Sequence, residues 1–496
     1  MTGAVTRRGL LKGGAAAVVG WSVAGGLWVT EAGAATMDAS GLARVPRLDG
    51  TLESSADVLG SFGKDFGGLV TTSPKAVFRP GSVRDVQKMV AYATENRIKI
   101  AMNGQAGSGA DIESHSSYGQ AGVNGGIAID AKSLSTIHSI DDRSADVDAG
   151  VTWAQLTDAA LAKGKTPPAL TDYLHLSVGG TISVGGIGGQ VAKYGLQCDL
   201  VEELTIVVGD GSLLTCSASL RPDLFNAALA GGGQVGIIVR AKVKLVRAPE
   251  RALVLGLYYD DLATYLADGE KILAEGTFDG QAGEIVRKAD DSGWRYKIEA
   301  VAYHAASETP DRDALLAGLR DDRASLTADD YAYRDYAFRL DPFEAFLKEG
   351  GYWEGPKPWL SLVLPASRVR EFVESAAAEL TAADLGGGFL LFYPFFKSKL
   401  TRPMFAMPSE PVAYLFDLLR FPNPGEQGIQ RMLEQNRRLY DRAVALGGKR
   451  YLVGAIPGMT AAEWRRHFGA NWDRLAMAKR LYDPAGVLTP GQGFFA

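Results

Sequence analysis

Residues 171–190 read TDYLHLSVGGTISVGGIGGQ, and this run of small and hydroxyl-bearing side chains decides the fold prediction. Glycines leave room for backbone N–H groups to approach an anionic ligand, and serine and threonine hydroxyls can add hydrogen bonds. The same glycines would also suit a turn that only packs closely against a neighbouring backbone. Taken alone, the stretch therefore predicts either a ligand-binding loop or a close-packed turn.

A unit of two strands and a helix precedes this stretch. We expect a short strand at Ala76–Pro80, a helix over Ser82–Asn96 and a second strand at Ile98–Met102. Ser82 and Asp85 have the spacing of a capping box, in which each side chain accepts the backbone N–H of the other. Apolar residues recur at the spacing of one helical face, at Val86, Met89, Val90 and Ala93.

The same pattern returns closer to the glycine-rich stretch. Ala145–Gly150 is expected to be a strand, and Thr152 with Gln155 forms a second capping box for a helix that ends near Lys163. Short strands covered by helices predict an α+β or α/β arrangement for the N-terminal half.

A second glycine-rich segment, GGGQVG at Gly231–Gly236, matches the dinucleotide fingerprint G-x-G-x-x-G letter by letter. It follows a helix-like segment, Asp223–Ala230, and precedes a strand-like one, Ile237–Val246. The fingerprint needs the opposite order, with its glycines between a strand and the N-terminus of a helix. We therefore expect no nicotinamide dinucleotide site here.

From about residue 248 the pattern changes to strand-like runs with helices between them. Strands are expected at Leu253–Tyr259, Arg295–His304, Pro358–Leu364 and Phe389–Phe395. Helices are expected at Asp311–Leu319 and Ser367–Leu380. This texture predicts a second domain, a mainly antiparallel sheet with helices on one face. A chain of 496 residues is also too long for one hydrophobic core.

Composition excludes several kinds of partner. The net charge is −5, and no cluster of Lys and Arg occurs beyond the first dozen residues, so nucleic acid is not an expected partner. Two cysteines, Cys198 and Cys216, allow at most one disulfide and no Cys-rich metal site. The five histidines include no pair at i, i+3 or i, i+4 spacing, so we expect no metal site built by the protein.

The first 36 residues are expected to be an export signal. Thr6–Lys12 carries the pair Arg7-Arg8, a mostly small and apolar run covers Gly13–Val29, and Ala32–Ala34 offers the small side chains that a signal peptidase needs. A membrane anchor is the alternative, but the run is short and rich in Gly and Ala. We expect twin-arginine export to the periplasm or the extracellular space, with no stable membrane anchor after signal removal. Export in the folded state suggests a tightly held organic cofactor.

Several segments together carry a resemblance to a known family. They are residues 171–190, Gly209–Ser217, RPDLFNAALAGGGQVGIIVRAKV at 221–243, Tyr451-Leu452, EWRRHFGANWDR at 463–474 and Pro490–Gln492. In order and spacing they resemble the FAD-dependent oxidoreductases of the vanillyl-alcohol oxidase superfamily, which have a PCMH-type FAD-binding domain, and most closely the cytokinin dehydrogenases. The resemblance is strong over 62–248 and 434–496 and weak between them.

The resemblance implies an α+β fold of two domains. After the signal at 1–36, residues 37–247 would form the N-terminal part of a discontinuous FAD domain. Residues 248–450 would form a substrate domain with an antiparallel sheet that caps the flavin, and 451–496 would return to the FAD domain.

The resemblance also implies how FAD is held. In the family, a Gly-x-Gly-His-Ser loop binds the pyrophosphate, and its histidine is bonded covalently to the flavin. Met102–Gln105 begins that loop, residues 106–113 look like an insertion, and the loop resumes so that His115 is the attachment site. An alternative register puts Gly107-Ser108 there and leaves FAD noncovalent. Further FAD contacts are implied at Gly104, Ser114, Ser116, Gln120, Ser177, Ser183, Ile187, Ile237, Tyr451, Thr489 and Gln492.

Asp172 is the expected catalytic residue. In cytokinin dehydrogenases the aspartate of a Trp-Thr-Asp-Tyr-Leu segment accepts a hydrogen bond or proton from the substrate amine while hydride leaves the adjacent carbon for flavin N5. Leu170 replaces that tryptophan here, and Leu452 would lie near the substrate. Without the resemblance, Asp172 would be interpreted as a turn or capping residue.

Three functions remain open from the sequence. The first is oxidation of a small molecule at a carbon next to an amine nitrogen, with oxygen or a quinone as the electron acceptor. The second is oxidation of a C–OH group, as in alcohol and sugar oxidases of the superfamily. The third is flavin binding without turnover.

Overall fold

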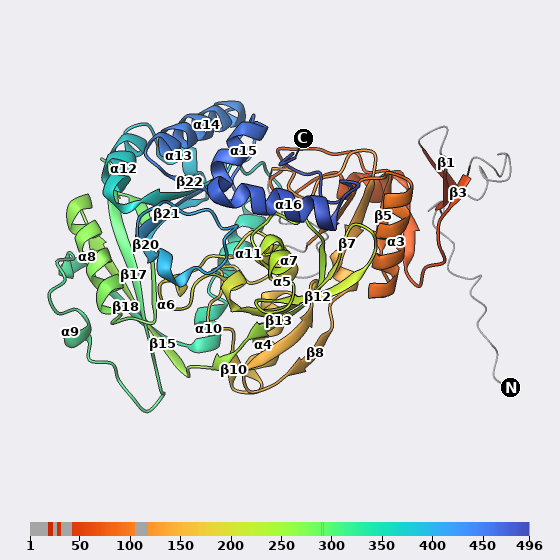
Figure 1. The fold of residues 1–496 in the computed structure, drawn as a ribbon. Helices are drawn as coiled ribbons and strands as arrows, with labels where there is room; N and C mark the ends of the chain where they lie inside the picture. The colour runs from red at the N-terminus through yellow and green to blue at the C-terminus, as the bar shows by residue number, and fades with distance from the viewer. Residues whose placement is uncertain are drawn as a thin grey trace.

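The computed structural model describes residues 18–22, 27–30, 42–104, 118–288, 290 and 292–495. Most of the predicted export signal lies outside this part of the chain, as do Ser114, His115 and Ser116. Three short strands near the N-terminus form a small sheet at one end of the molecule (Figure 1): β1 (Val18–Ser22), β2 (Leu27–Thr30) and β3 (Leu42–Arg44). Among the described residues, none of the helices has both the length and the apolar character of a membrane span.

The first sheet of the N-terminal part has four strands in the order β4-β5-β7-β6. They are β4 (Thr51–Glu53), β5 (Ala76–Arg79), β6 (Ile100–Asn103) and β7 (Ile127–Asp130). Strands β5, β7 and β6 run parallel, and β4 pairs antiparallel with β5. Two helices accompany them, α2 (Ala56–Phe62) and α3 (Val83–Glu95).

Helix α3 begins as its sequence predicts, with one difference. The Ser82 hydroxyl accepts the backbone N–H of Asp85 at 3.3 Å, and the predicted apolar face is buried. The Asp85 carboxylate does not complete the capping box. It accepts backbone N–H groups of Asp49, Gly50 and Gly81 instead, because this preceding segment folds against the start of the helix. Asp85 therefore anchors a distant loop with its carboxylate instead of capping its own helix.

The second sheet is antiparallel, in the order β12-β11-β13-β9-β8. Its strands are β8 (Ile137–Ile140), β9 (Ser144–Asp148), β11 (Val201–Val207), β12 (Leu213–Ser217) and β13 (Ile237–Lys244). The accompanying helices are α4 (Trp153–Leu161), α5 (Val178–Ile182), α6 (Val191–Tyr194) and α7 (Pro222–Ala228). The capping box of Thr152 and Gln155 at the start of α4 is confirmed. Gly231–Gly236 lies after α7 and before β13, which confirms that the order of a nicotinamide dinucleotide site is reversed.

The third sheet, here called the cap sheet, has eight antiparallel strands in the order β18-β15-β17-β16-β20-β21-β19-β22. They are β15 (Arg251–Tyr259), β16 (Gly280–Arg287), β17 (Trp294–His304), β18 (Thr327–Ala332), β19 (Leu360–Pro365), β20 (Phe389–Phe396), β21 (Val412–Leu419) and β22 (Lys449–Arg450). Strands β10 (Lys165–Thr166) and β14 (Val246–Arg247) pair separately. The expected antiparallel sheet is thus confirmed.

Helices cover one face of the cap sheet, as the sequence predicts. Figure 1 shows three of them along its outer side, α8 (Leu262–Glu275), α12 (Val369–Ala377) and α14 (Ile429–Ala445). Alternate residues of β21, including Tyr414, Phe416 and Leu418, are buried against these helices. The opposite residues of the strand are left to face the N-terminal part.

Shorter helices complete the second half: α9 (Arg312–Leu315), α10 (Tyr333–Ala337), α11 (Asp341–Glu349), α13 (Ala382–Leu385) and α15 (Ala461–Phe468). The helix predicted at Asp311–Leu319 is shorter than expected. The helix ends at Leu315 and cannot continue through Gly318, whose φ of +71° is incompatible with a right-handed helix.

The C-terminal segment returns to the N-terminal part. Helix α16 (Trp472–Tyr482) packs on α7, and the Lys479 ammonium donates to the carbonyls of Gln234 and Leu488. The backbone N–H of Thr489 donates to the carbonyl of Ile100, the first residue of β6. The last residues therefore extend the first sheet near the glycine-rich segments.

Candidate active site

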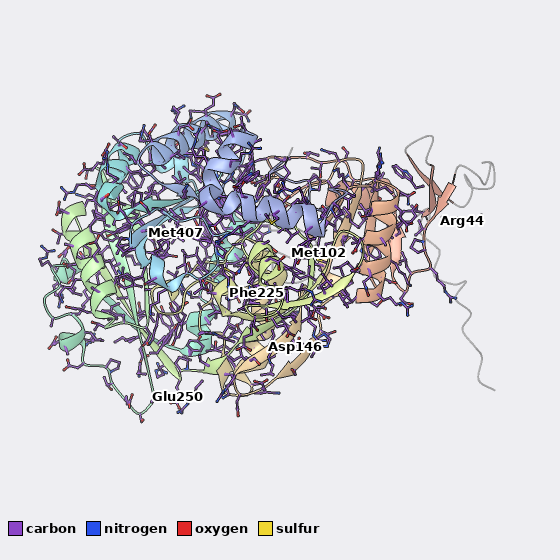
Figure 2. All side chains as sticks on the ribbon, viewed as in Figure 1. Arg44, Met102, Asp146, Phe225, Glu250 and Met407 are labelled. Carbon is purple, nitrogen blue, oxygen red and sulfur yellow. The ribbon has the colours of Figure 1, made fainter. Side chains whose placement is uncertain are left out.

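A large cavity lies between the N-terminal part and the free face of the cap sheet. Its empty space, counted out to its open mouth, is about 1780 Å³. Met102, which Figure 2 labels near the centre of the molecule, lies in its wall. Residues of the N-terminal part and residues of the cap sheet line the cavity together.

Most of the residues implied by the resemblance meet at this cavity. Nine of them line it: Gly104, Gln120, Asp172, Ser177, Ser183, Ile187, Ile237, Tyr451 and Thr489. Leu452 does not line it, and its backbone carbonyl accepts the side-chain N–H of Gln120 at 3.3 Å. Gln492 lies in a separate hollow beside Tyr118 and Arg450. Its amide nitrogen and oxygen are buried and find no hydrogen-bond partner within the described residues.

The glycines form a narrow part of the wall where any side chain would intrude. A Cβ added to Gly104 would lie 2.5 Å from the Ser177 hydroxyl, and one added to Gly180 would lie 2.8 Å from it. Gly232 and Gly233 have φ values of +68° and +72°, which favour glycine. Backbone therefore lies directly at the cavity surface, as an anionic ligand bound through N–H groups requires.

Asp172 lies on the segment between β10 and α5, and its carboxylate is held by an arginine. The Arg339 guanidinium donates to Asp172 Oδ1 at 2.5 Å, and Arg339 Nε lies 3.6 Å from Glu299 Oε1. The guanidinium also lies over the Tyr336 ring, 4.4 Å from its centroid. Arg339 comes from the link between α10 and α11, far from Asp172 in sequence.

The environment of Asp172 makes its carboxylate more basic than an ordinary one. Burial raises its pKa, the positive charge of Arg339 opposes this, and the negative charge of Glu299 raises it further, with a net increase. The side chain remains 17% exposed, so it is accessible from the cavity. A partly desolvated carboxylate with a raised pKa suits a group that accepts a proton or a hydrogen bond from a ligand.

The wall of the cavity away from the glycines is aromatic. Phe66 packs edge-on against Trp353 and Trp359, with ring centroids 4.8 Å and 5.6 Å apart, and Trp359 packs edge-on against Phe421 at 5.7 Å. Such interlocked rings form a rigid apolar surface. This side of the cavity is suited to a flat apolar ligand.

Comparison of the chain with known proteins identifies its family. The model described as "FAD binding domain" matches residues 74–217, and the one described as "Cytokinin dehydrogenase 1, FAD and cytokinin binding" matches 274–495. An uncharacterized oxidoreductase of the fasciation locus of Rhodococcoides fascians is 37% identical, over 87% of this chain and 96% of its own. Cytokinin dehydrogenase 2 of Arabidopsis thaliana is 31% identical over 90% and 94%, and cytokinin dehydrogenase 4 of Oryza sativa is 32% identical over 90% of each.

The chain belongs to the cytokinin dehydrogenase family. It is an FAD-dependent oxidoreductase, as the sequence predicts. The cavity lining fits this cofactor, because glycine backbone suited to a diphosphate and aromatic side chains suited to a flat ring system border the same space. The FAD-binding model spans Gly104 and the segment 171–190.

This member of the cytokinin dehydrogenase family also has site residues that sequence reasoning missed. They are Arg339, between α10 and α11, and two residues of the cavity wall, Tyr393 on β20 and Asp417 on β21. No motif or regular spacing in the sequence points to them, because each is a single polar residue among unrelated neighbours. Glu344, which accepts the Tyr173 hydroxyl at 2.9 Å, lines the cavity from α11. The alternation of β20 and β21 could have indicated which residues share the face of Asp417.

Proposed function

We propose that the enzyme oxidises a small molecule at a carbon next to an amine nitrogen; two of its plant relatives are named cytokinin dehydrogenases. The observation that carries this proposal is Asp172, a carboxylate with a raised pKa on the wall of the cavity. FAD, when bound, supplies the electron acceptor, flavin N5, for hydride. The chain's own residues have to bind, orient and deprotonate the substrate.

Asp172 acts as the acceptor for the substrate N–H. As hydride leaves the neighbouring carbon, positive charge develops on the C–N unit, and a carboxylate that removes or hydrogen-bonds the N–H proton stabilises it. Arg339 holds the carboxylate in one orientation through Oδ1. The aromatic wall excludes water from the reacting carbon and leaves the substrate ring little freedom to move.

An anaerobic screen of amines and alcohols tests the reaction class. Amines should bleach the flavin absorbance as they are oxidised to imines, and hydrolysis of the imine by water should then give an aldehyde and a shortened amine. A ketone, lactone or acid formed from an alcohol with no reaction of amines would replace this proposal with C–OH oxidation. A separate assay, in which the reduced flavin is mixed with oxygen or with a quinone and its reoxidation is followed, would identify the electron acceptor.

The Asp172→Asn variant tests the proposed base. It should keep FAD and lose about 10²-fold or more in the rate of flavin reduction, the scale of losing a general base. Asp146→Asn is a matched control, because Asp146 lies on β9, pairs with Arg240 of β13 and does not line the cavity. An unchanged rate in the Asp172 variant would remove this residue from the mechanism.

We also propose that FAD is bonded to His115 and that the protein is exported by the twin-arginine pathway. Both proposals rest on the sequence. Acid-precipitated protein should keep its yellow colour in the pellet, and His115→Ala should release the colour to the supernatant. Changing Arg7 and Arg8 to lysine should abolish export in a twin-arginine-competent host.

A further inference from the structure

Asp417 places a carboxylate on an apolar wall of the cavity. It lies on β21, directly opposite Leu391 of β20 and Ser361 of β19, so the three side chains share one face of the cap sheet. Leu415 and Leu419, two residues away on either side, line the cavity with it. If β21 only packed against the N-terminal part, an apolar residue would be expected at position 417.

The carboxylate has no cation among the described residues. The Ser361 hydroxyl donates to Asp417 Oδ1, and no hydrogen bond or ion pair engages Oδ2 within the described part of the chain. The two other acidic residues of the cavity lining do have cations: Asp172 pairs with Arg339, and Glu344 with Lys348 at 2.9 Å. A buried carboxylate without a cation is unfavourable unless a ligand supplies one.

A second polar group lies beside Asp417 without a partner. Tyr393 of β20 is paired with Leu415, so it is the diagonal neighbour of Asp417 on the same face. Its hydroxyl is buried, lines the cavity side of the strand and has no hydrogen-bond partner among the described residues. Asp417 Oδ2 and the Tyr393 hydroxyl are thus two polar groups on the same face of the sheet that have no hydrogen-bond partner among the described residues.

The charge of the cavity lining indicates what these acceptors would bind. Among its described residues are three carboxyl groups and no Lys, Arg or His side chain. Carboxylates and hydroxyls in such a setting bind N–H donors, and they bind cationic donors most strongly. Burial raises the pKa of Asp417 to about 7; the Ser361 hydrogen bond opposes this increase and the charge of Asp172 adds to it. An increase is expected for a buried carboxyl that has no cation beside it.

We propose that Asp417 and Tyr393 form a subsite for a second, cationic nitrogen group of the substrate, separate from the nitrogen that Asp172 receives. A planar amidinium fits, because it carries a positive charge and N–H donors on two nitrogens, one for each of these two groups. Ser361 is a positioning residue, since it holds the other carboxylate oxygen. This inference deepens the proposed amine oxidation and rests on it for the identity of the reacting carbon.

Binding of matched probes to the oxidised holoenzyme tests the subsite without turnover. Benzamidine is a planar cation, and benzamide has the same ring and no charge. Each is titrated while the flavin difference spectrum is recorded. Benzamidine should bind at least about tenfold more tightly than benzamide, the scale of one charge-assisted hydrogen bond. Equal affinity for the two probes, or no binding of benzamidine, would overturn the proposal.

Variants assign the effect to named residues. Asp417→Asn, which keeps the size of the side chain and an oxygen for Ser361, should weaken benzamidine binding by roughly 10- to 100-fold and leave benzamide unchanged. Tyr393→Phe should weaken benzamidine by a smaller factor. Glu284→Gln is the control, because Glu284 lies on β16 of the same sheet, pairs with Lys297 and does not line the cavity. Unchanged benzamidine binding in both Asp417→Asn and Tyr393→Phe would refute the subsite.

The experiments distinguish failure of the proposed amine oxidation from failure of the proposed subsite. If no amine bleaches the flavin but benzamidine binding depends on Asp417, the proposed oxidation is wrong and the cationic subsite stands. If amines are oxidised and Asp417→Asn changes neither KM nor kcat for amines that carry a second cationic group, the subsite is wrong. For such substrates we expect the variant to raise KM by about tenfold or more and to leave kcat within about twofold.

Discussion

Replacing Asp417 with asparagine should make the protein increasingly more stable than the unmutated protein as the pH rises from about 4 to about 8. The Asp417 side chain is 6% exposed, and its carboxyl group is enclosed by the cap sheet and the cavity wall. Asparagine has almost the same shape and keeps an oxygen that can accept the Ser361 hydroxyl. The substitution therefore removes the ionisation and little else.

The size and sign of the effect follow from the pKa. Burial, supported by the charge of Asp172 and opposed by Ser361, raises the pKa of Asp417 from its ordinary 3.8 to about 7. Between these pH values the folded protein holds a proton that the unfolded chain has released, so this group's contribution to stability is present below about pH 4 and lost as the pH passes about 7. A difference of about three pKa units corresponds to about 4 kcal/mol. Asparagine has no such dependence.

Urea unfolding of both proteins at several pH values, with equal FAD content, measures this difference. The free energy of unfolding of Asp417→Asn minus that of the unmutated protein should rise with pH by up to about 1.4 kcal/mol per unit and level off above about pH 8. A difference that stays constant with pH, or that falls as the pH rises, would refute the argument that burial raises the pKa of this carboxyl.

Three further outcomes are expected. Arg339→Gln removes the cation that lowers the pKa of Asp172, so the acid limb of the kcat/KM profile should move to higher pH; an unshifted limb would mean that the pair does not control the base. Gly188→Ala places a Cβ 1.9 Å from the Leu170 carbonyl oxygen and should lower the free energy of unfolding by about 1–3 kcal/mol, measured by urea titration; an unchanged midpoint would contradict this contact. Phe416→Ala removes a buried side chain under the helices of the cap sheet and should lower the free energy of unfolding by about 3–5 kcal/mol, with the flavin spectrum unchanged. A decrease below about 1 kcal/mol would show that this core is not tightly packed.

Local patterns predicted most elements of the fold. The capping box of Thr152 and Gln155 begins α4 as expected, and the runs at Leu253–Tyr259 and Arg295–His304 are strands with ends shifted by one or two residues. Signals of this kind act within one turn or one strand, so neighbouring residues are enough to specify them. For Asp85 the predicted hydrogen bond from its backbone N–H to Ser82 is present, but its carboxylate binds a loop more than thirty residues away instead of the start of its own helix.

The sequence by itself determined the family, the positions of the glycines that border the cavity and the identity of Asp172 as the candidate base. Only the tertiary structure decided what surrounds that base. Arg339 is 167 residues from Asp172 and meets it because the cap sheet closes over the N-terminal part. Asp417 is one polar residue in an apolar strand until pairing of β21 with β19 and β20 turns it toward the cavity. The physical reason is that ion pairs, burial and pKa values depend on distances in space, and these are set by the packing of segments far apart in the chain.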